Sequence, residues 1–465
     1  MSKQKLSKNL SSLSVLALAF GCIIGWGAFV LPGSRILIKS GPLGATIGFI
    51  IATFVIMVIA LNYNYMIKKF PSAGGSFKYT QEALGSTNAF VCAWFLSLTY
   101  ITLIPLNATA LALITRSLLD NVFQFGFQYE LAGYTVYLGE VILAIVAVIL
   151  FAVLSIKNTK LTGNFQILLT ILLLLGVLII LLTAIVSDKA SLDNLQPYFS
   201  PETSIIGGVL SVIVIAPWAF IGFDTVPQAS EEFNFSVSKT RNILILSISF
   251  GAFVYIALNL VTAMVVPNGY GNWIEYIKDV DNLSGIKSLP TFYATYSLLE
   301  NTGLVFLGLS VLAAILSGLI GFYMASSRLL YAMAKNNVIP SWFGKLDKKY
   351  NTPTNAILFI MFFSIITPFF GRNALMWLVD MASIGAAIGY GYTSLAALKY
   401  AWQDKEIFTM ITGVLGSLFS LFFIVVLVVP IKELNISLGK ESYVALLCWV
   451  ITGVLFYMRK NRKIL

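Results

Sequence analysis

Two short segments hold the residues of this sequence whose types and spacing could carry chemistry. One reads GCIIGWGAFVLPG over 21–33, and the other reads APWAFIGFDTVPQ over 216–228. Each interrupts an apolar stretch, and glycine and proline at this density disfavour a continuous helix. A broken helix persists in lipid only where its freed backbone groups face protein, water or a ligand. The pair therefore predicts a binding site on two broken membrane helices, with close packing of small residues as the alternative.

The backbone of these segments predicts how a ligand with separated charges would be held. Where the helix resumes after the break in 21–33, the backbone amides at its start would stabilise a carboxylate. Carbonyl oxygens released at both breaks suit an α-ammonium group. No charged side chain is required at either end of the ligand. The expected substrate-binding residues are Ile23, Gly25, Trp26, Gly27, Trp218, Ala219 and Ile221.

Asp224 is the acidic residue that the second segment places inside the membrane. A carboxylate there is energetically expensive, so it is usually neutralised, paired or open to a water-filled path. Asp224 is therefore a candidate for taking up a proton and coupling it to substrate movement. The alternative is that its carboxylate caps backbone amides at a helix end. Glu231 and Glu232 are expected in the following loop, paired with Lys239 or Arg241.

Other kinds of chemistry have few residues to support them. The chain contains no histidine, which removes histidine-based acid–base catalysis and histidine-ligated metals. Cys22, Cys92 and Cys448 lie far apart in apolar runs, where burial as small side chains is expected rather than a disulfide or zinc site. The sequence has no phosphate-binding loop of the Gly-x-x-x-x-Gly-Lys-Ser/Thr type. We expect no enzyme activity, cofactor, metal or nucleic-acid partner.

The composition indicates which elements must position the two segments. Of the 465 residues, 58% are apolar or aromatic and 11% are charged, whereas soluble domains carry about 25% charged residues. The chain is therefore expected to be an all-α integral membrane protein. Apolar stretches of spanning length predict twelve transmembrane helices, near 12–37, 42–67, 88–118, 136–156, 162–186, 204–228, 242–266, 303–330, 354–371, 374–397, 409–430 and 443–458.

The basic residues predict the orientation in the membrane. Most Lys and Arg residues fall in segments predicted to lie on the same side of the membrane as the N-terminus, such as Lys69, Lys348 and Lys349. This bias is typical of cytoplasmic loops. Both termini are then cytoplasmic, in what we expect to be a bacterial inner membrane. Arg328 and Lys335 would lie near anionic lipid headgroups. The first apolar stretch lacks a cleavage site and is expected to remain as a membrane span.

Four parts of the chain resemble the amino acid–polyamine–organocation (APC) superfamily of secondary transporters. They are GCIIGWGAF at 21–29, FPSAGGSFKY at 70–79, WAFIGFDTVPQASEE at 218–232, and SRLLYAMAKNNVIPSWF at 327–343 with TPTNA at 352–356. Their order and spacing match the family over nearly the whole chain. The resemblance implies one transporter domain, 1–465, with the leucine-transporter fold. Its parts would be inverted five-helix repeats at 12–186 and 204–397, with helices 1 and 6 broken, and two peripheral helices at 409–458.

The resemblance also implies roles around the broken helices. Trp218 falls where relatives carry an aromatic gate, Phe220 stands beside it, and Asn107 would line the pocket. Packing and helix–helix hydrogen bonds are the alternatives. Some relatives couple to protons through a lysine in the fifth span, but 164–178 contains none. A sodium site would use Ser317 and is less favoured than proton coupling.

Trp26 departs from the family pattern, in which a small residue or Ser/Thr usually stands beside the substrate carboxylate. Its ring would either narrow the pocket or stack on the substrate. Taken together, the features predict a secondary active transporter that moves an amino acid or related amine by alternating access, as an antiporter or proton symporter. The alternative is a membrane sensor or receptor that keeps the fold without flux.

Overall fold

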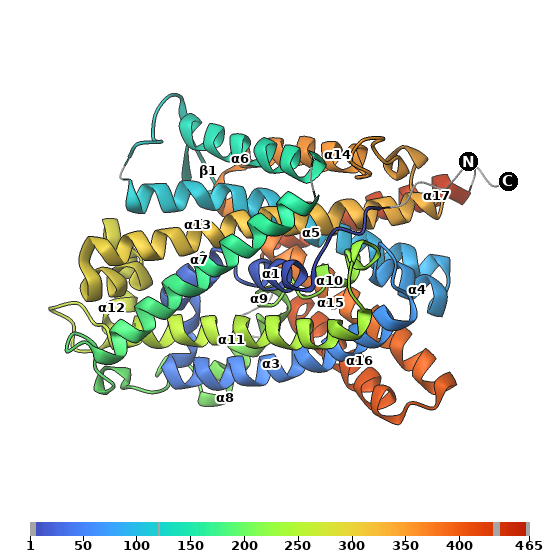
Figure 1. The fold of residues 1–465 in the computed structure, drawn as a ribbon. Helices are drawn as coiled ribbons and strands as arrows, with labels where there is room; N and C mark the ends of the chain where they lie inside the picture. Colours follow the sequence, from blue (N-terminus) through green and yellow to red (C-terminus); the bar gives the residue numbers. More distant parts are fainter. Residues whose placement is uncertain (1–5, 120, 158, 431–437, 462–465) are drawn as a thin grey trace.

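The chain folds into a bundle of helices that run side by side, as Figure 1 shows. The computed structural model describes residues 6–119, 121–157, 159–430 and 438–461, so residues 1–5 of the basic N-terminal segment lie outside the described part. The helices are α1 (Ser12–Ile23), α2 (Gly27–Leu31), α3 (Leu37–Lys69), α4 (Ser76–Leu84), α5 (Ser86–Leu118), α6 (Leu138–Lys157), α7 (Thr159–Val186), α8 (Ile205–Val214), α9 (Ala216–Ala219), α10 (Thr225–Gln228), α11 (Thr240–Met264), α12 (Trp273–Asp279), α13 (Pro290–Lys335), α14 (Thr354–Ile366), α15 (Gly371–Asp404), α16 (Ile407–Val428) and α17 (Lys440–Asn461).

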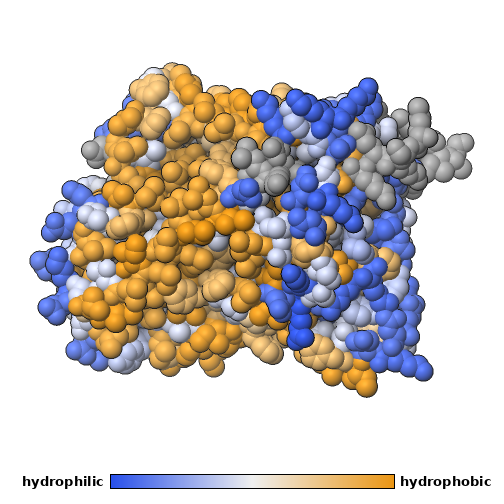
Figure 2. Space-filling model, viewed as in Figure 1, coloured by the Kyte–Doolittle hydropathy of each residue, from blue (hydrophilic) through white to orange (hydrophobic). Residues whose placement is uncertain are grey.

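The surface carries a broad hydrophobic band between two hydrophilic ends, which is the pattern of a protein that crosses a membrane (Figure 2). Within the described residues, eight helical stretches are long and apolar enough to cross: Ser12–Lys69, Ser86–Arg116, Leu138–Lys157, Thr162–Val186, Val237–Met264, Pro290–Lys335, Ile407–Val428 and Lys440–Met458. The predicted helical membrane protein is confirmed at this level. The count of twelve spans stays a prediction, because the first stretch runs through two predicted spans, and Ile205–Val214 and Thr354–Phe370 are shorter apolar helices.

A small β-hairpin between α5 and α6 was not expected from the sequence. Its antiparallel strands are β1 (Gln128–Leu131) and β2 (Tyr134–Tyr137). Arg116, near the end of α5, donates a hydrogen bond to the Thr135 carbonyl at 2.9 Å and forms an ion pair with Glu140 of α6. The hairpin is thereby held against the ends of two long helices.

Both predicted interruptions are present at the centre of the bundle (Figure 1). The first helix stops at Ile23 and resumes at Gly27, because Ile24 adopts an extended conformation with φ −92° and ψ 91°. The second break is the unwound segment 220–224 between α9 and α10. Gly222 in this segment has φ 141°, and a Cβ atom there would lie 2.5 Å from the backbone nitrogen of Ile23. The two breaks therefore pack backbone against backbone, which only glycine permits.

A buried ion pair links the segment after α10 to α13. Arg328 donates from Nε and Nη2 to the two carboxylate oxygens of Glu232, at 2.7 and 3.0 Å, and both side chains are 1% exposed. Its Nη1 also donates to the Ser327 hydroxyl at 3.1 Å. The prediction that Arg328 faces lipid headgroups and that Glu232 pairs with Lys239 or Arg241 is therefore wrong. These partners are 96 residues apart, so local sequence could not reveal them.

The segment before α1 lies directly over this ion pair. The Leu10 amide donates to the Glu232 carbonyl at 3.1 Å, and the Asn234 amide donates to the Leu10 carbonyl at 3.0 Å. Glu231 turns away and accepts a hydrogen bond from the Ala73 amide at 3.3 Å. Four chain segments are thus tied together at one end of the bundle, at Leu10, Ala73, Glu232 and Arg328, and we call this arrangement the inner closure.

Arg328→Ala should lower the free energy of unfolding by about 3–5 kcal/mol, because it leaves Glu232 buried without its partner. Thermal unfolding of the purified protein in detergent micelles measures the effect. Lys78→Ala is the control, since it removes the exposed pair with Glu82 one helical turn away, which should change stability by less than about 1 kcal/mol. Equal unfolding midpoints for the two variants would show that the buried pair does not hold the fold together.

Candidate functional site

Two tryptophans from the broken helices separate two cavities. The outer cavity has a volume of about 460 Å³ and lies where α2 leads into α3. The central chamber, of about 30 Å³, lies deeper, between the two breaks and helices α5, α11 and α13. Trp26 and Trp218 line both cavities, and their rings meet edge to face with centroids 6.2 Å apart. These two rings form the partition through which a ligand would have to pass.

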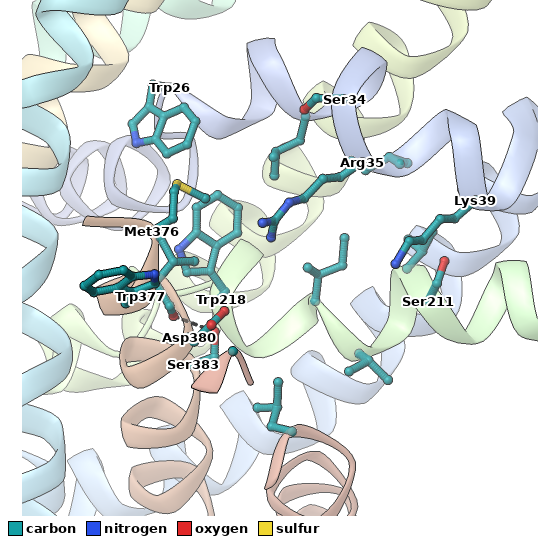
Figure 3. A pocket seen from close by; sticks show the side chains of 18 of the residues that line it. Trp26, Ser34, Arg35, Lys39, Ser211, Trp218, Met376, Trp377, Asp380 and Ser383 are labelled. Atoms are coloured by element: carbon teal, nitrogen blue, oxygen red, sulfur yellow. Dashed lines mark hydrogen bonds between the residues drawn. The ribbon is translucent and has the colours of Figure 1, made fainter. Parts of the chain in front are cut away.

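The outer cavity presents charges of both signs. Figure 3 shows Arg35, from the turn Pro32–Ile36 that leads into α3, and Lys39, from the first turn of α3, beside the cavity. Asp380 and Ser383 of α15 lie at the opposite wall. The Asp380 carboxylate also accepts a hydrogen bond from the Ser442 hydroxyl at 2.8 Å. Charges of both signs suit the approach of a zwitterion, whose carboxylate and ammonium can each meet an opposite charge.

The break in the first helix exposes backbone to the central chamber. The first hydrogen bonds of α2 run from Ala28 to the Gly25 carbonyl and from Phe29 to the Trp26 carbonyl, at 3.2 and 3.1 Å. The amides at the start of a helix precede the regular ladder of helical hydrogen bonds. Gly25 and Trp26 line the chamber, so the predicted carboxylate position opens onto it. Ile23 and Gly27 line the chamber from either side of the break.

Glycine at position 27 is required by the partition itself. A Cβ atom at Gly27 would overlap the six-membered ring of Trp218, whereas a Cβ atom at Gly25 would meet only Asn107 Oδ1, at 3.7 Å. The two neighbouring glycines therefore have different tasks. The missing side chain of Gly27 makes room for the Trp218 ring, and the missing side chain of Gly25 leaves open the space that faces Asn107.

The second break contributes fewer groups than the sequence predicted. Ile221 lines the chamber, but the Trp218 carbonyl accepts a hydrogen bond from the Ile221 amide at 3.2 Å, so it is not the free acceptor that we expected. Phe220 packs on Tyr255 with ring centroids 6.2 Å apart. Neither Phe220 nor Ala219 is among the residues that line the two cavities. Phe220 therefore supports the wall from behind.

Asn107 has an unusual hydrogen-bonding state. Its Nδ2 donates to the Leu103 carbonyl of the same helix at 2.8 Å, while its Oδ1 is buried and has no partner among the described residues. The side chain is 4% exposed and lines the central chamber. A buried acceptor without a donor is destabilising unless a ligand or water supplies one. The predicted pocket role of Asn107 agrees with this placement.

Asp224 is buried outside the lining of the chamber, and both of its carboxylate oxygens accept hydrogen bonds. Oδ2 accepts a hydrogen bond from the Tyr100 hydroxyl at 2.6 Å, and Oδ1 accepts from the Gly222 amide at 2.9 Å. The carboxylate thus accepts from an amide within the second break, and it makes no capping hydrogen bond to the start of α10, the helix that Asp224 precedes. Tyr100 of α5 was missed in the sequence, because a single tyrosine in an apolar helix gives no signal of its partner.

Ser317, the predicted sodium residue, faces α1 and α7. Gln166 of α7 donates from Nε2 to the Ser317 hydroxyl, and the same nitrogen donates to the Ala17 carbonyl at 3.2 Å. The Ser317 hydroxyl and the Ala17 carbonyl, two oxygens that could bind a cation, therefore both accept from the Gln166 amide nitrogen. Among the described residues, no group of three or more Cys, Asp or Glu side chains is placed to hold a metal ion. Gln166 was not singled out in the sequence.

The fold defines a polytopic membrane protein with two cavities at its broken helices. The amino acid permease family matches residues 10–455. The chain therefore belongs to the amino acid permease family of the APC superfamily, whose members are transporters and not enzymes.

Relatives with different substrates share similarity over almost the whole chain. The branched-chain amino acid permease BcaP of Bacillus subtilis is 24% identical, over 99% of this chain and 94% of its own. The arginine/ornithine antiporter of Latilactobacillus sakei is 24% identical, over 100% and 92%. The low-affinity putrescine importer PlaP of Escherichia coli K12 is 21% identical, over 87% and 83%. At these identities the names do not select a substrate.

Gly27→Ala should destabilise the protein by about 1–3 kcal/mol, because the added methyl group must displace the Trp218 ring from a packed site. Gly25→Ala is the matched control, since its methyl group would enter the chamber without a clash. Thermal unfolding of both variants in the same detergent is the measurement. A Gly27→Ala midpoint equal to that of Gly25→Ala would contradict the proposed packing of the partition.

Proposed function

We propose that the protein is a secondary active transporter that moves an amino acid or a related amine by alternating access. The observation that carries this proposal is the partition formed by Trp26 and Trp218 between a wide outer cavity and a small central chamber. The opposite end of the bundle is sealed by the inner closure around Glu232 and Arg328. A site that two rings divide from a cavity on one side, and that a buried ion pair closes off on the other, is what alternating access requires.

The proposed architecture has twelve spans, with 12–186 and 204–397 as inverted repeats and 409–458 as two peripheral helices. Helices that fall within each of the twelve predicted ranges support it. The two interrupted spans are then the first helix of each repeat, which supports the assignment of the breaks as corresponding parts. With cytoplasmic termini, the outer cavity faces the outside of the cell and the inner closure faces the cytoplasm.

The proposed binding mode uses backbone at both ends of the substrate. Its carboxylate lies at the amides around Gly25 and Gly27, at the start of a helix. Its ammonium group lies near the carbonyls of Ile23 and Ile221 and the free oxygen of Asn107. The Trp218 ring swings aside to admit the substrate and returns over it. Relatives named for amino acid uptake, arginine/ornithine exchange and putrescine import support this substrate range.

We further propose that Asp224 couples transport to protons. It is buried at the second break, and the Tyr100 hydroxyl and the Gly222 amide both meet its carboxylate. Gain or loss of a proton by the Asp224 carboxylate would change the hydrogen bonds that hold the second break together. Protonation would therefore be linked to the shape of the site. The Gln166 amide beside Ser317 favours proton coupling, or exchange without an ion, over a sodium site.

Transport is tested with purified protein in liposomes and radiolabelled amino acids and amines. Wild type should accumulate at least one of them, and Trp218→Ala should reduce uptake by about tenfold or more, because the partition is lost. Trp402→Ala is the control, since Trp402 is 74% exposed, and it should transport like wild type. Saturable binding without any flux would support a sensor or receptor instead.

Asp224→Asn should keep substrate exchange but lose accumulation driven by a pH gradient, because the amide has a similar shape and cannot titrate. The measurement is uptake into proteoliposomes with and without an imposed gradient. Tyr100→Phe is the matched control, because it removes one hydrogen bond but keeps the carboxyl group, and it should retain a response to the gradient. If uptake by Asp224→Asn responded fully to the pH gradient, Asp224 would only hold the second break together and would not couple transport to protons.

A further inference from the structure

We propose that the central chamber selects zwitterionic amino acids whose side chains are uncharged and apolar. This inference rests on the proposed transport function and narrows its substrate class. It excludes amino acids with cationic or anionic side chains, as well as diamines. Three observations support it: the apolar wall of the chamber, the position of the charged groups around it, and the unpaired acceptor oxygen of Asn107.

The side chains that form most of the chamber wall are apolar or aromatic. They are Leu103 and Leu106 of α5, Ile221 of the second break, Tyr255 of α11 and Phe322 of α13, and all five are buried. Among the described residues that line the chamber, none carries a charge. An apolar side chain entering this wall gains by leaving water, whereas a charged end would lose its hydration without a partner.

The charged groups nearest to the chamber are committed elsewhere or lie outside it. Asp224 is held by the Tyr100 hydroxyl and the Gly222 amide and does not line the chamber. Arg35 and Asp380 line only the outer cavity, beyond the two tryptophans. A lysine, arginine or ornithine side chain in the chamber would therefore find no free carboxylate.

Aromatic rings alone do not reverse this preference. Trp26, Trp218, Tyr255 and Phe322 present ring surfaces to the chamber, and such surfaces attract cations. The attraction is smaller than the free energy needed to strip a second ammonium or guanidinium group of its water. The same rings pack well against branched or aromatic side chains, for which no charge must be desolvated.

Asn107 supplies an acceptor for one ammonium group. Its Oδ1 is buried and unpaired, and it lies 3.7 Å from the point where a Cβ atom of Gly25 would be. The oxygen therefore faces the break where the substrate backbone is proposed to bind, and we assign it to the α-ammonium group. A diamine would bring a second cation, for which the described residues of the chamber offer no carboxylate and no second unpaired amide oxygen.

The test is competition for binding and uptake by the wild-type protein. Leucine, isoleucine, valine, methionine and phenylalanine are compared with arginine, ornithine, glutamate and putrescine, by ligand-induced thermal stabilisation and by uptake into liposomes. The apolar amino acids should bind at least about tenfold more tightly than any charged compound. Equal or tighter binding of arginine, ornithine, glutamate or putrescine would overturn the substrate class while leaving transport intact. If no compound binds or moves, the proposed function fails and this inference fails with it.

A second measurement isolates Asn107. Asn107→Leu should weaken leucine binding by about 10- to 100-fold, the usual effect of losing a hydrogen bond to a charged group. Asn259→Leu is a closely matched control, because Asn259 is also buried, donates from Nδ2 to the carbonyl one turn earlier and has an unpaired Oδ1, but does not line the chamber. Asn259→Leu should bind leucine like wild type. Equal affinities for the two variants would remove Asn107 from the site.

Discussion

The direct backbone contact between the two helix breaks is the constraint on which the rest of this structure depends. Gly222 lies against the backbone of Cys22 and Ile23, with no room for a Cβ atom. In the middle of a membrane, unwound backbone is stable only where protein or ligand replaces the missing helical partners. Each break therefore shields the other, and the Asp224 carboxylate satisfies an amide within the second break. The cavities exist because this contact leaves the remaining backbone groups facing inward.

Charge is distributed along the axis of the bundle in a way that fits this constraint. The outer cavity is lined by the exposed Arg35 and the half-buried Asp380. The central chamber carries no charged side chain among its described residues, and the inner closure buries Glu232 with Arg328. Buried charges are tolerated at the closure because the arginine fork matches both carboxylate oxygens. A charged side chain in the chamber would lose its hydration each time a substrate bound. Backbone groups and the amide of Asn107 can bind one substrate after another without that cost.

The sequence predicted those parts of the site that depend on local backbone chemistry. Glycine and proline density located both breaks, whereas the role of Trp218 as an aromatic gate was suggested only by the resemblance to the superfamily. The same reasoning could not find contacts made by folding. It placed Arg328 at a lipid surface and treated the Trp218 carbonyl as free, because the positions of Glu232 and of the Ile221 amide are set by tertiary packing and by a local turn. The number of spans and the repeat boundaries remain predictions for the same reason.

The hydrogen bonds from the segment before α1 to the segment after α10 have a kinetic consequence. Leu10 is bonded through its backbone to Glu232 and Asn234, on the same strip of chain whose side chain pairs with Arg328. If this side opens, as the proposed alternating access requires, the backbone bonds of Leu10 and the Glu232–Arg328 pair would have to separate together, because they share one strip of chain. Opening would then be one cooperative event rather than a sequence of small independent movements. Partly opened intermediates would be sparsely populated, which would limit uncoupled leakage.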